Sequence, residues 1–459
     1  MKLNHIKRLF STSVFLFVVA ITSAQTLNSG YFLDGSFDRH HLNPAFTPER
    51  NYFSLPVMGH ISMDVLSTVG LSNFIYESTS HPDNLTTFMS ADIDKAAFLD
   101  ALPGVTRIGV DLDLDLFAVG FKGFQGYNTI NLNLRNSEHV SIPKELFDFM
   151  KSSFSEGDYL IKDINVNSTS YLELAFGHSH RVNENLTVGA KFKYLIGIAY
   201  ADLNIDQIHA VVNGNSWSVN ANATMRVAAS GLYFTHKDPA TNEFDGVEFK
   251  FKGLSGSGFA VDLGAEYDMK DLVQGLTLSA SLTDLGLIKW KRTNTAMTHN
   301  NEPVVFDGFG NDGSDMEETM DQLQDDFDKL LKLYDEGQSV TKTNIGATLR
   351  LGAEYVMPFY SGLSAGMLLT QQTGAWNYSE GRLSLIVSPN GWFEATANAA
   401  LSSYGASFGW LINFHPAGCN LFFGSDSFKI KLNPQFIPVS DFRTNFVFGV
   451  KFPIGKKNV

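Results

Sequence analysis

The chain has 459 residues, with 48 Asp and Glu against 34 Lys and Arg, and a formal net charge of -14. Such an acidic chain is a poor candidate for binding nucleic acid, because affinity for phosphate comes largely from Lys and Arg. A single cysteine, Cys419, excludes an internal disulfide framework and a cysteine-based zinc site. The 38 Phe and 39 Gly, with only 18% charged residues, are typical of strand-rich proteins.

Residues 1–24 have the three parts of a secretory signal peptide. Lys2, Lys7 and Arg8 form a basic start, an apolar run covers 9–21, and small residues at 22–24 precede Gln25. The apolar run is too short for a permanent membrane helix. We therefore expect the signal to be cleaved and the mature chain, residues 25–459, to be exported.

The strongest pattern along the mature chain is alternation with a period of two. From Leu186 to Tyr200 every even position is apolar, whereas the odd positions include Lys191 and Lys193. Successive side chains of a strand point to opposite faces, so one face favours hydrocarbon and the other water. The same pattern recurs over residues 217–227, 259–267, 345–355, 393–401, 404–414 and 446–452.

Alternation also occurs in soluble sandwiches and propellers, but three features favour a membrane protein. These are the export signal, strands of the roughly nine to eleven residues that a tilted bilayer span requires, and aromatic residues at strand ends, where interfacial girdles lie. We predict an all-β fold, a transmembrane antiparallel β-barrel of about 14 strands in the outer membrane. The expected girdle residues are Tyr171, Tyr194, Tyr200, Trp217, Tyr267, Trp290, Tyr355, Phe393, Tyr404 and Phe414.

Charged residues fall on the polar faces of several predicted strands. Asp111, Asp113 and Asp115 alternate with apolar residues. Such carboxylates lie roughly 7 Å apart along a strand and cannot converge on one ion without other strands. We expect them in a solvated lumen balanced by basic groups, with no metal and no cofactor. The candidate lumen charges are Asp111, Asp113, Asp115, Lys191, Lys193, Arg226, Arg350 and Glu354.

These mixed signs do not describe a strongly selective ion pore, which would use rings of one sign; they suit a lumen partly filled by ion pairs and by an inserted segment. Enzymatic signatures are missing as well, since the sequence contains neither a His-Glu-x-x-His helix nor a Gly-x-Ser-x-Gly elbow. We therefore expect that the protein is not an enzyme.

Residues 314–336 follow a helical period instead. Their apolar residues form one stripe, Ser314 with Glu317 resembles a capping box, and Gly337 is a stop. The other face is strongly acidic. This amphipathic helix either docks a partner from a long loop or packs its stripe on the barrel mouth as a lid. Shorter helices are expected around 92–102 and 143–154.

The mature N-terminus reads Tyr31-Phe32-Leu33-Asp34 and then Arg39-His40-His41-Leu42-Asn43-Pro44-Ala45-Phe46. An Asn-Pro-Ala box before the first strand resembles the FadL-type long-chain fatty acid transporters and the PorV-type barrels of the type IX secretion system. The resemblance implies that residues 25–50 form a hatch that plugs the lumen. An ordinary capped turn is the alternative for Asn43, Pro44 and Ala45.

The segment Ser281-Leu282-Thr283-Asp284-Leu285-Gly286-Leu287-Ile288-Lys289-Trp290 and the acidic insertion after it complete the pattern. Together with the N-terminal box they resemble an uncharacterised outer-membrane barrel family common in Bacteroides-type bacteria. We interpret Asp284, Gly286 and Trp290 as a strand end with an interfacial Trp.

Two functions remain open from the sequence. The first is passive transport of small or hydrophobic molecules past the hatch, as the FadL resemblance implies. The second is a non-transport surface barrel that anchors or recruits partner proteins in a secretion or surface-assembly role, as the PorV resemblance implies. Outer-membrane lipid is a contact in both, and nucleic acid in neither.

Overall fold

The computed structural model describes residues 27–48, 50–77, 85–152, 156–213, 216–238, 240–250, 253–299, 304–305, 331–374, 376–429 and 442–455. The predicted signal peptide and residues 314–330 of the predicted acidic helix lie outside these ranges. Within them, none of the helices is long and apolar enough to cross a membrane.

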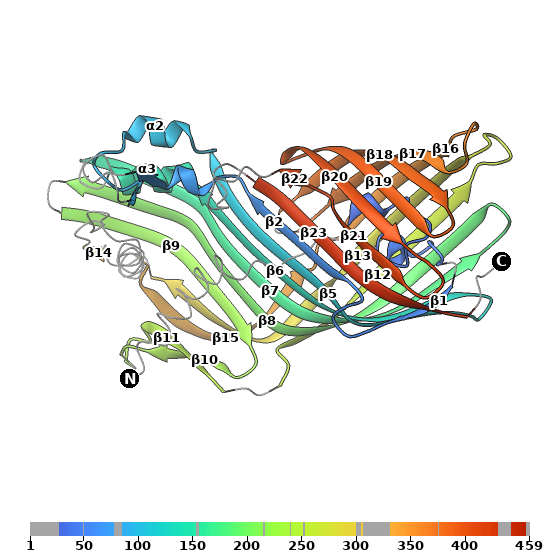
Figure 1. The fold of residues 1–459 in the computed structure, drawn as a ribbon. Coiled ribbons are helices and arrows are strands. Elements are labelled where there is room, and N and C mark those ends of the chain that lie inside the picture. Colours follow the sequence, from blue (N-terminus) through green and yellow to red (C-terminus); the bar gives the residue numbers. More distant parts are fainter. Residues whose placement is uncertain are drawn as a thin grey trace.

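Antiparallel strands close into a barrel of 14 strands (Figure 1). In ring order these are the broken strand β1 (Asn51–Ser54) and β2 (Ile61–Ser67), β5 (Val105–Gly123), β6 (Gly126–Pro143), β7 (Gly157–Arg181), β8 (Leu186–Asn213), β12 (Gly256–Asp268), β13 (Leu276–Thr298), β16 (Thr348–Val356), β17 (Leu363–Gln372), β18 (Tyr378–Asn390), β19 (Phe393–Ser402), β20 (Gly405–Phe414), the broken strand β21 (Asn420–Ser425) and β22 (Phe428–Lys429), and β23 (Phe442–Ile454). The ring closes where β23 pairs with β1, with Asn51 opposite Ile454. The predicted fold class is therefore confirmed.

The two ends of the barrel differ. At one end the strands are joined by short turns, such as residues 124–125 between β5 and β6, and the last strand ends. At the other end are longer connections and the remaining elements: η3 (Leu71–Asn73), β3 (Ile75–Glu77), β4 (Leu85–Thr87), α2 (Lys95–Asp100), α3 (Lys144–Lys151), β9 (Ser216–Ala229), β10 (Leu232–His236), β11 (Phe244–Phe249), β14 (Val304–Val305) and β15 (Leu333–Asn344). Helices α2 and α3 confirm the two shorter predicted helices. Outer-membrane barrels keep short turns in the periplasm and long loops outside, so α2 and α3 lie on the outer side.

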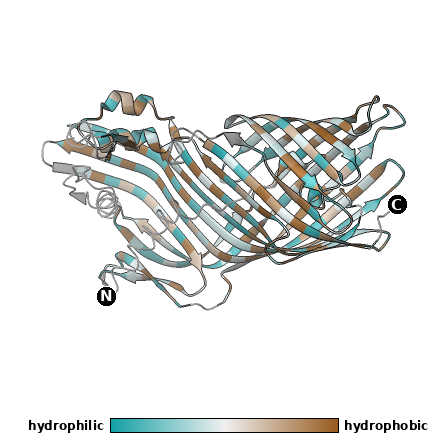
Figure 2. Ribbon diagram, viewed as in Figure 1, coloured by the Kyte–Doolittle hydropathy of each residue, from teal (hydrophilic) through white to brown (hydrophobic). Residues whose placement is uncertain are grey.

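The barrel wall is apolar outside and polar inside at the height of the membrane. On β8, Phe192 is 47% exposed whereas its neighbour Lys193 is 2% exposed. Figure 2 shows this alternation along most strands of the wall. Phe176, Phe259 and Leu285 are exposed in the same way on neighbouring strands. Such a continuous apolar outer surface suits lipid rather than water, which supports a place in the outer membrane.

One side of the wall is much taller than the other. Strands β5 to β8 have 19, 18, 25 and 28 residues, more than the roughly nine to eleven of a tilted span. Strands β16 to β20 have 9 to 13. Beyond the membrane, β9 takes the place of β12 beside β8, from Ala199 to Asn213. We call this part, formed by the outer halves of β5–β8 with β9, the outer extension.

In the outer extension the apolar side chains of the strands face inward, whereas in the membrane part of the wall they face outward. The strand predicted over 217–227 is present as β9, but its apolar residues Val219 and Ala223 are buried in a core and do not meet lipid. Ile205 and Ile208 on β8 and Phe98 and Phe149 of α2 and α3 belong to the same core. The expectation of a lipid-facing side was wrong here, because this part stands in water and turns its apolar face inward.

A bulge in β13 turns the side chain of Trp290 inward, whereas the sequence predicted it at the lipid interface. Before the bulge Leu278 faces outward and Ser281 inward; after it Leu285 faces outward. The step lies at Asp284, whose φ is +60° and whose N–H donates to Oδ1 of Asp262 over 2.8 Å. One extra residue in a strand moves every following side chain to the other face.

Trp290 is consequently 0% exposed instead of interfacial. It stacks on Tyr200 with ring centroids 5.4 Å apart and donates from Nε1 to Thr343 over 2.9 Å. Tyr171 lies in the same buried cluster. The expectation that Tyr171, Tyr200 and Trp290 belong to an interfacial girdle is therefore wrong.

The predicted acidic helix does not reach its expected end at Glu336. Leu333 to Glu336 lie in strand β15, where Leu333 pairs with Thr298 and Asp335 with Ala296 of β13. Gly337, the expected helix stop, lies beside a register shift of this pairing and has a φ of +84°. The outer part of β13 offers unpaired backbone groups, and pairing with them overrides the local helical pattern.

Candidate functional site

Residues 27–48 run inside the barrel as turns and the short 3-10 helices η1 (Asn28–Gly30) and η2 (Arg39–His41), shown in blue in Figure 1. We call this segment the hatch. Its rings occupy places where the wall has glycines: a Cβ at Gly366 would lie 2.5 Å from the ring of Phe32, and one at Gly352 would lie 2.6 Å from that of Tyr31. The fit of ring to glycine shows why small residues recur on the inward face.

The Asn-Pro-Ala box forms a turn and also contacts the barrel wall. Asn43 Oδ1 accepts a hydrogen bond from the N–H of Ala45 over 3.0 Å, as in a capped turn. Its Nδ2 donates to the carbonyls of Ala265 and Ala280, on β12 and β13, over 3.2 and 3.3 Å. Below it, a Cβ at Gly264 would lie 2.0 Å from Asn43 Oδ1. The box is thus fitted to a flat part of the wall.

Polar groups of the wall hold the first turns of the hatch. The backbone N–H groups of Asn28 and Ser29 donate to the Asp426 carboxylate over 2.6 and 2.5 Å. The N–H of Gly35 donates to both oxygens of Glu394, each over 3.0 Å. Backbone N–H groups of the hatch are thus held by buried carboxylates of the wall.

Beside the hatch, an ion-pair chain crosses six neighbouring strands of the wall, from β5 to β13. Arg135 Nε lies 3.1 Å from Asp113 and 3.6 Å from Glu173, and Lys193 Nζ lies 3.6 Å from Glu173. Lys193 also lies 2.9 Å from Asp262 and 2.5 Å from Asp284. The bulge that turns Trp290 inward thus also brings Asp284 to this network.

The other predicted lumen charges lie in separate places. Asp111 lies 3.3 Å from His139, and Lys191 donates to the His40 carbonyl over 3.1 Å. Arg350 donates from Nε to Asn28 Oδ1 over 3.0 Å, and Glu354 accepts from Ser364 over 2.6 Å. Arg226 pairs with Asp202 at 3.3 Å in the outer extension, away from the hatch.

The predicted solvated lumen is wrong for most of these groups. Asp113, Asp115, Lys191, Lys193 and Arg350 are all buried. The hatch fills the space that water would take. A cavity of about 10 Å³ remains between the hatch and the wall near His40 and Lys191, about enough for one water molecule.

A second charged cluster joins the hatch to the closing strands. Lys451 Nζ on β23 lies 2.6 Å from Asp38 Oδ1 and 3.5 Å from Asp115 Oδ2 on β5. His60, before β2, places Nδ1 3.5 Å from Asp38 Oδ1. Burial alone would raise the pKa of Asp38, but Lys451 and His60 outweigh it, so that pKa lies below its usual range.

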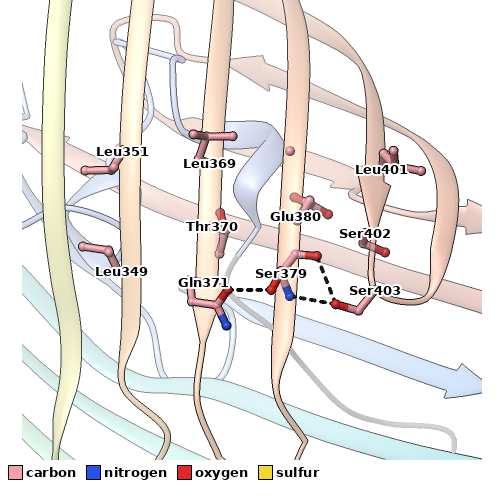
Figure 3. A pocket seen from close by; sticks show the side chains of 11 residues that line it. Leu349, Leu351, Leu369, Thr370, Gln371, Ser379, Glu380, Leu401, Ser402 and Ser403 are labelled. Carbon is pink, nitrogen blue, oxygen red and sulfur yellow. Dashed lines mark hydrogen bonds between the residues drawn. The ribbon is translucent and has the colours of Figure 1, made fainter.

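A groove on the outer wall is a separate feature (Figure 3). It encloses about 480 Å³ over β16–β19 and is lined by Leu349, Leu351, Leu369 and Leu401 around Gly381. These leucines are exposed on the lipid-facing side. Figure 3 shows its polar rim, where Ser379 bonds to Gln371 and Ser403. The groove therefore faces lipid and not the lumen.

A family model described as a family of unknown function, DUF5723, matches residues 44–426. The chain belongs to this family. No curated protein sequence matches the chain.

Similar solved structures are outer-membrane barrels. The toluene transporter TodX of P. putida is 10% identical, with 95% of this chain and 96% of that one covered and a TM-score of 0.40. A FadL homologue of Pseudomonas aeruginosa is 9% identical, with 94% and 98% covered and a TM-score of 0.41. The translocator domain of the autotransporter NalP from Neisseria meningitidis is 9% identical, with 86% and 89% covered and a TM-score of 0.31. At these identities the likeness concerns the fold alone.

Several hatch-binding residues of this DUF5723 member were missed in the sequence. Lys451 had a usable signal, because it falls on the polar phase of the alternation over 446–452. Asp426 and His60 had none, since both lie in connections between strands. Asp426 acts through contacts with Asn28 and Ser29, 398 and 397 positions earlier, and His60 through its contact with Asp38.

Proposed function

We propose that this barrel passively transports a small hydrophobic molecule, with residues 27–48 as the gate. The observation that carries the proposal is the apolar inward face of the outer extension. Water-filled barrels have a polar interior at every level. Ligand sites for hydrophobic molecules are instead concave and mostly apolar, with few polar groups.

The apolar face has a removable cover. Ile205, Ile208 and Val212 of β8 are buried against a core that includes Phe98 of α2 and Phe149 of α3. Helices α2 and α3 have only 6 and 8 residues, and helices this short have little stability of their own. In the proposed cycle the helices lift, a hydrophobic molecule takes the place of their aromatic side chains, and the hatch then yields.

Uptake of N-phenyl-1-naphthylamine, an apolar fluorescent probe, by cells that express the protein tests the proposal. Ile208→Asn places an amide on the apolar face and should lower uptake by about tenfold, since an unpartnered buried polar group costs roughly 1–3 kcal/mol. Gln207→Asn, on the exposed face of the same strand, is the matched control and should leave uptake unchanged. Heat-modifiable gel mobility checks that each variant folds.

Equal uptake by cells with and without the wild-type protein would contradict transport. The alternative, a surface barrel that recruits partner proteins, rests on the acidic segment 314–330. Deleting this segment and comparing pull-downs from intact outer membrane tests it. Loss of a specific partner, with uptake absent in the wild type, would favour recruitment over transport.

A further inference from the structure

Three buried groups with unused ligand atoms meet where the hatch touches the wall. Asp38 and His41 belong to the hatch and Asp115 to β5, and one ligand atom from each lies within 4.8 Å of the other two. Their exposed fractions are 9%, 9% and 0%. Asp38 Oδ2, His41 Nε2 and Asp115 Oδ2 have no hydrogen-bond partner among the described residues.

His60 places a fourth possible donor beside Asp38. Its Nδ1 lies 3.5 Å from Asp38 Oδ1, and both of its ring nitrogens are buried without a hydrogen-bond partner in the described ranges. Its ring centroid is 5.9 Å from that of His41. Leaving a buried donor or acceptor unsatisfied costs roughly 1–3 kcal/mol, so several such atoms in one cluster point to a ligand.

Lys451 is a partner for the two carboxylates of the cluster but not for its imidazole nitrogens. Its ammonium lies close to Asp38 and Asp115 and balances their charge. It satisfies neither the Nε2 of His41 nor the ring nitrogens of His60. A cation that accepts electron pairs from imidazole nitrogens and carboxylate oxygens together would satisfy Nε2 of His41 and one ring nitrogen of His60.

We propose that Asp38, His41 and Asp115, with His60 as a fourth donor, bind a divalent transition-metal ion, with zinc as the best match, that fastens the hatch to the wall. Mixed nitrogen and oxygen donors suit zinc. At zinc–ligand distances of roughly 2.1 Å, tetrahedral ligand atoms lie about 3.4 Å apart. The donors must therefore close by about 1 Å, and the Lys451 ammonium must turn aside, toward the Tyr52 ring 5.0 Å away.

His40, also in the hatch, is a matched control for the replacement of His41. Both ring nitrogens of His40 have partners, Nε2 with the Tyr52 hydroxyl at 2.6 Å and Nδ1 with Lys191 Nζ at 3.1 Å. His40 is buried even more deeply than His41 and is adjacent to it in the chain. Replacing either histidine removes one buried imidazole, but only His41 is a proposed ligand.

The test measures zinc bound to the purified, full-length barrel without a histidine tag, by elemental analysis after dialysis against a zinc buffer. We expect about one zinc per chain in the wild type and in His40→Gln, and loss in His41→Gln and Asp115→Asn. Cobalt in place of zinc should give visible d–d absorption that is lost in the same two variants. Heat-modifiable mobility identifies any variant that does not fold.

The variant Lys451→Gln tests whether the cluster binds zinc or whether its carboxylates are only neutralised by the lysine. Removing the competing ammonium should tighten zinc binding by about tenfold or more, the size of effect that neighbours of a metal site have. No zinc in the wild type, equal loss in both histidine variants, or unchanged affinity in Lys451→Gln would each overturn the proposal. None of these outcomes depends on whether the barrel transports anything.

Discussion

The ammonium of Lys451 on the last barrel strand lies 2.6 Å from the carboxylate of Asp38, 413 positions earlier in the chain. This pair connects the hatch to the strand that closes the ring. Both groups are buried, and Lys451 also faces Asp115. Closing the barrel and seating the hatch are therefore coupled events.

Replacing Lys451 by Met should loosen the hatch in metal-free buffer. Two buried carboxylates would lose their cation, and removing one partner of a buried ion pair typically costs about 3–5 kcal/mol. Labelling of a cysteine at Ser36, in a Cys419→Ser background, by a membrane-impermeant maleimide measures this. We expect faster labelling in Lys451→Met and partial recovery when Asp38→Asn is added. Equal rates with and without Lys451→Met would contradict the pairing.

Adding one methyl group to the wall at Gly264 should displace the Asn-Pro-Ala box. A Cβ there would lie 2.0 Å from Asn43 Oδ1, and overpacking of this kind costs about 1–3 kcal/mol. Gly381→Ala is the matched control, since its Cβ would meet only Leu369 Cδ2 at 3.6 Å. Labelling at Ser36→Cys should rise in Gly264→Ala alone, and a rise in both would show that it is not specific to the hatch.

Trp290→Ala should destabilise the barrel strongly. The side chain is fully buried against Tyr200, and truncating such a ring costs about 3–5 kcal/mol. Leu287→Ala changes a lipid-facing residue of the same strand and should cost much less. Urea unfolding in detergent compares the two variants. Far-UV circular dichroism monitors the loss of strand structure, so the readout does not depend on tryptophan fluorescence. Similar losses would place Trp290 at the lipid interface, as the sequence suggested.

The period of two predicted the strands well, because it records two different environments along one strand. It could not show whether the apolar side of a given strand faces lipid or a buried core. The same alternation puts Phe192 in lipid on the inner half of β8, whereas on β9 it buries Val219 in a water-surrounded core. That difference depends on the height of each strand relative to the membrane, which no local pattern encodes.

The candidate site was predictable only in part. The Asn-Pro-Ala box and Lys193 stood out in the sequence because turn residues and alternating charges are local signals. The bulge at Asp284 was not visible, and it moved Trp290 from the expected interface to the interior. The partners of the hatch, such as Asp426 and Lys451, depend on closure of the ring.

Locking the hatch tests the central claim, that transport requires the hatch to move. Gly30 lies in the hatch, and a Cβ there would be 3.8 Å from Leu411 Cδ1 on β20, with no other close atom. The variant Gly30→Cys, Leu411→Cys and Cys419→Ser places two thiols close enough for a short, reducible bis-thiosulfonate reagent to cross-link them, and reductant can reopen the link in the same cells. The account predicts that the cross-link abolishes uptake of N-phenyl-1-naphthylamine and that reductant restores it, while either single cysteine variant is unaffected by the reagent. Uptake that persists at the same rate in the fully cross-linked protein would contradict it.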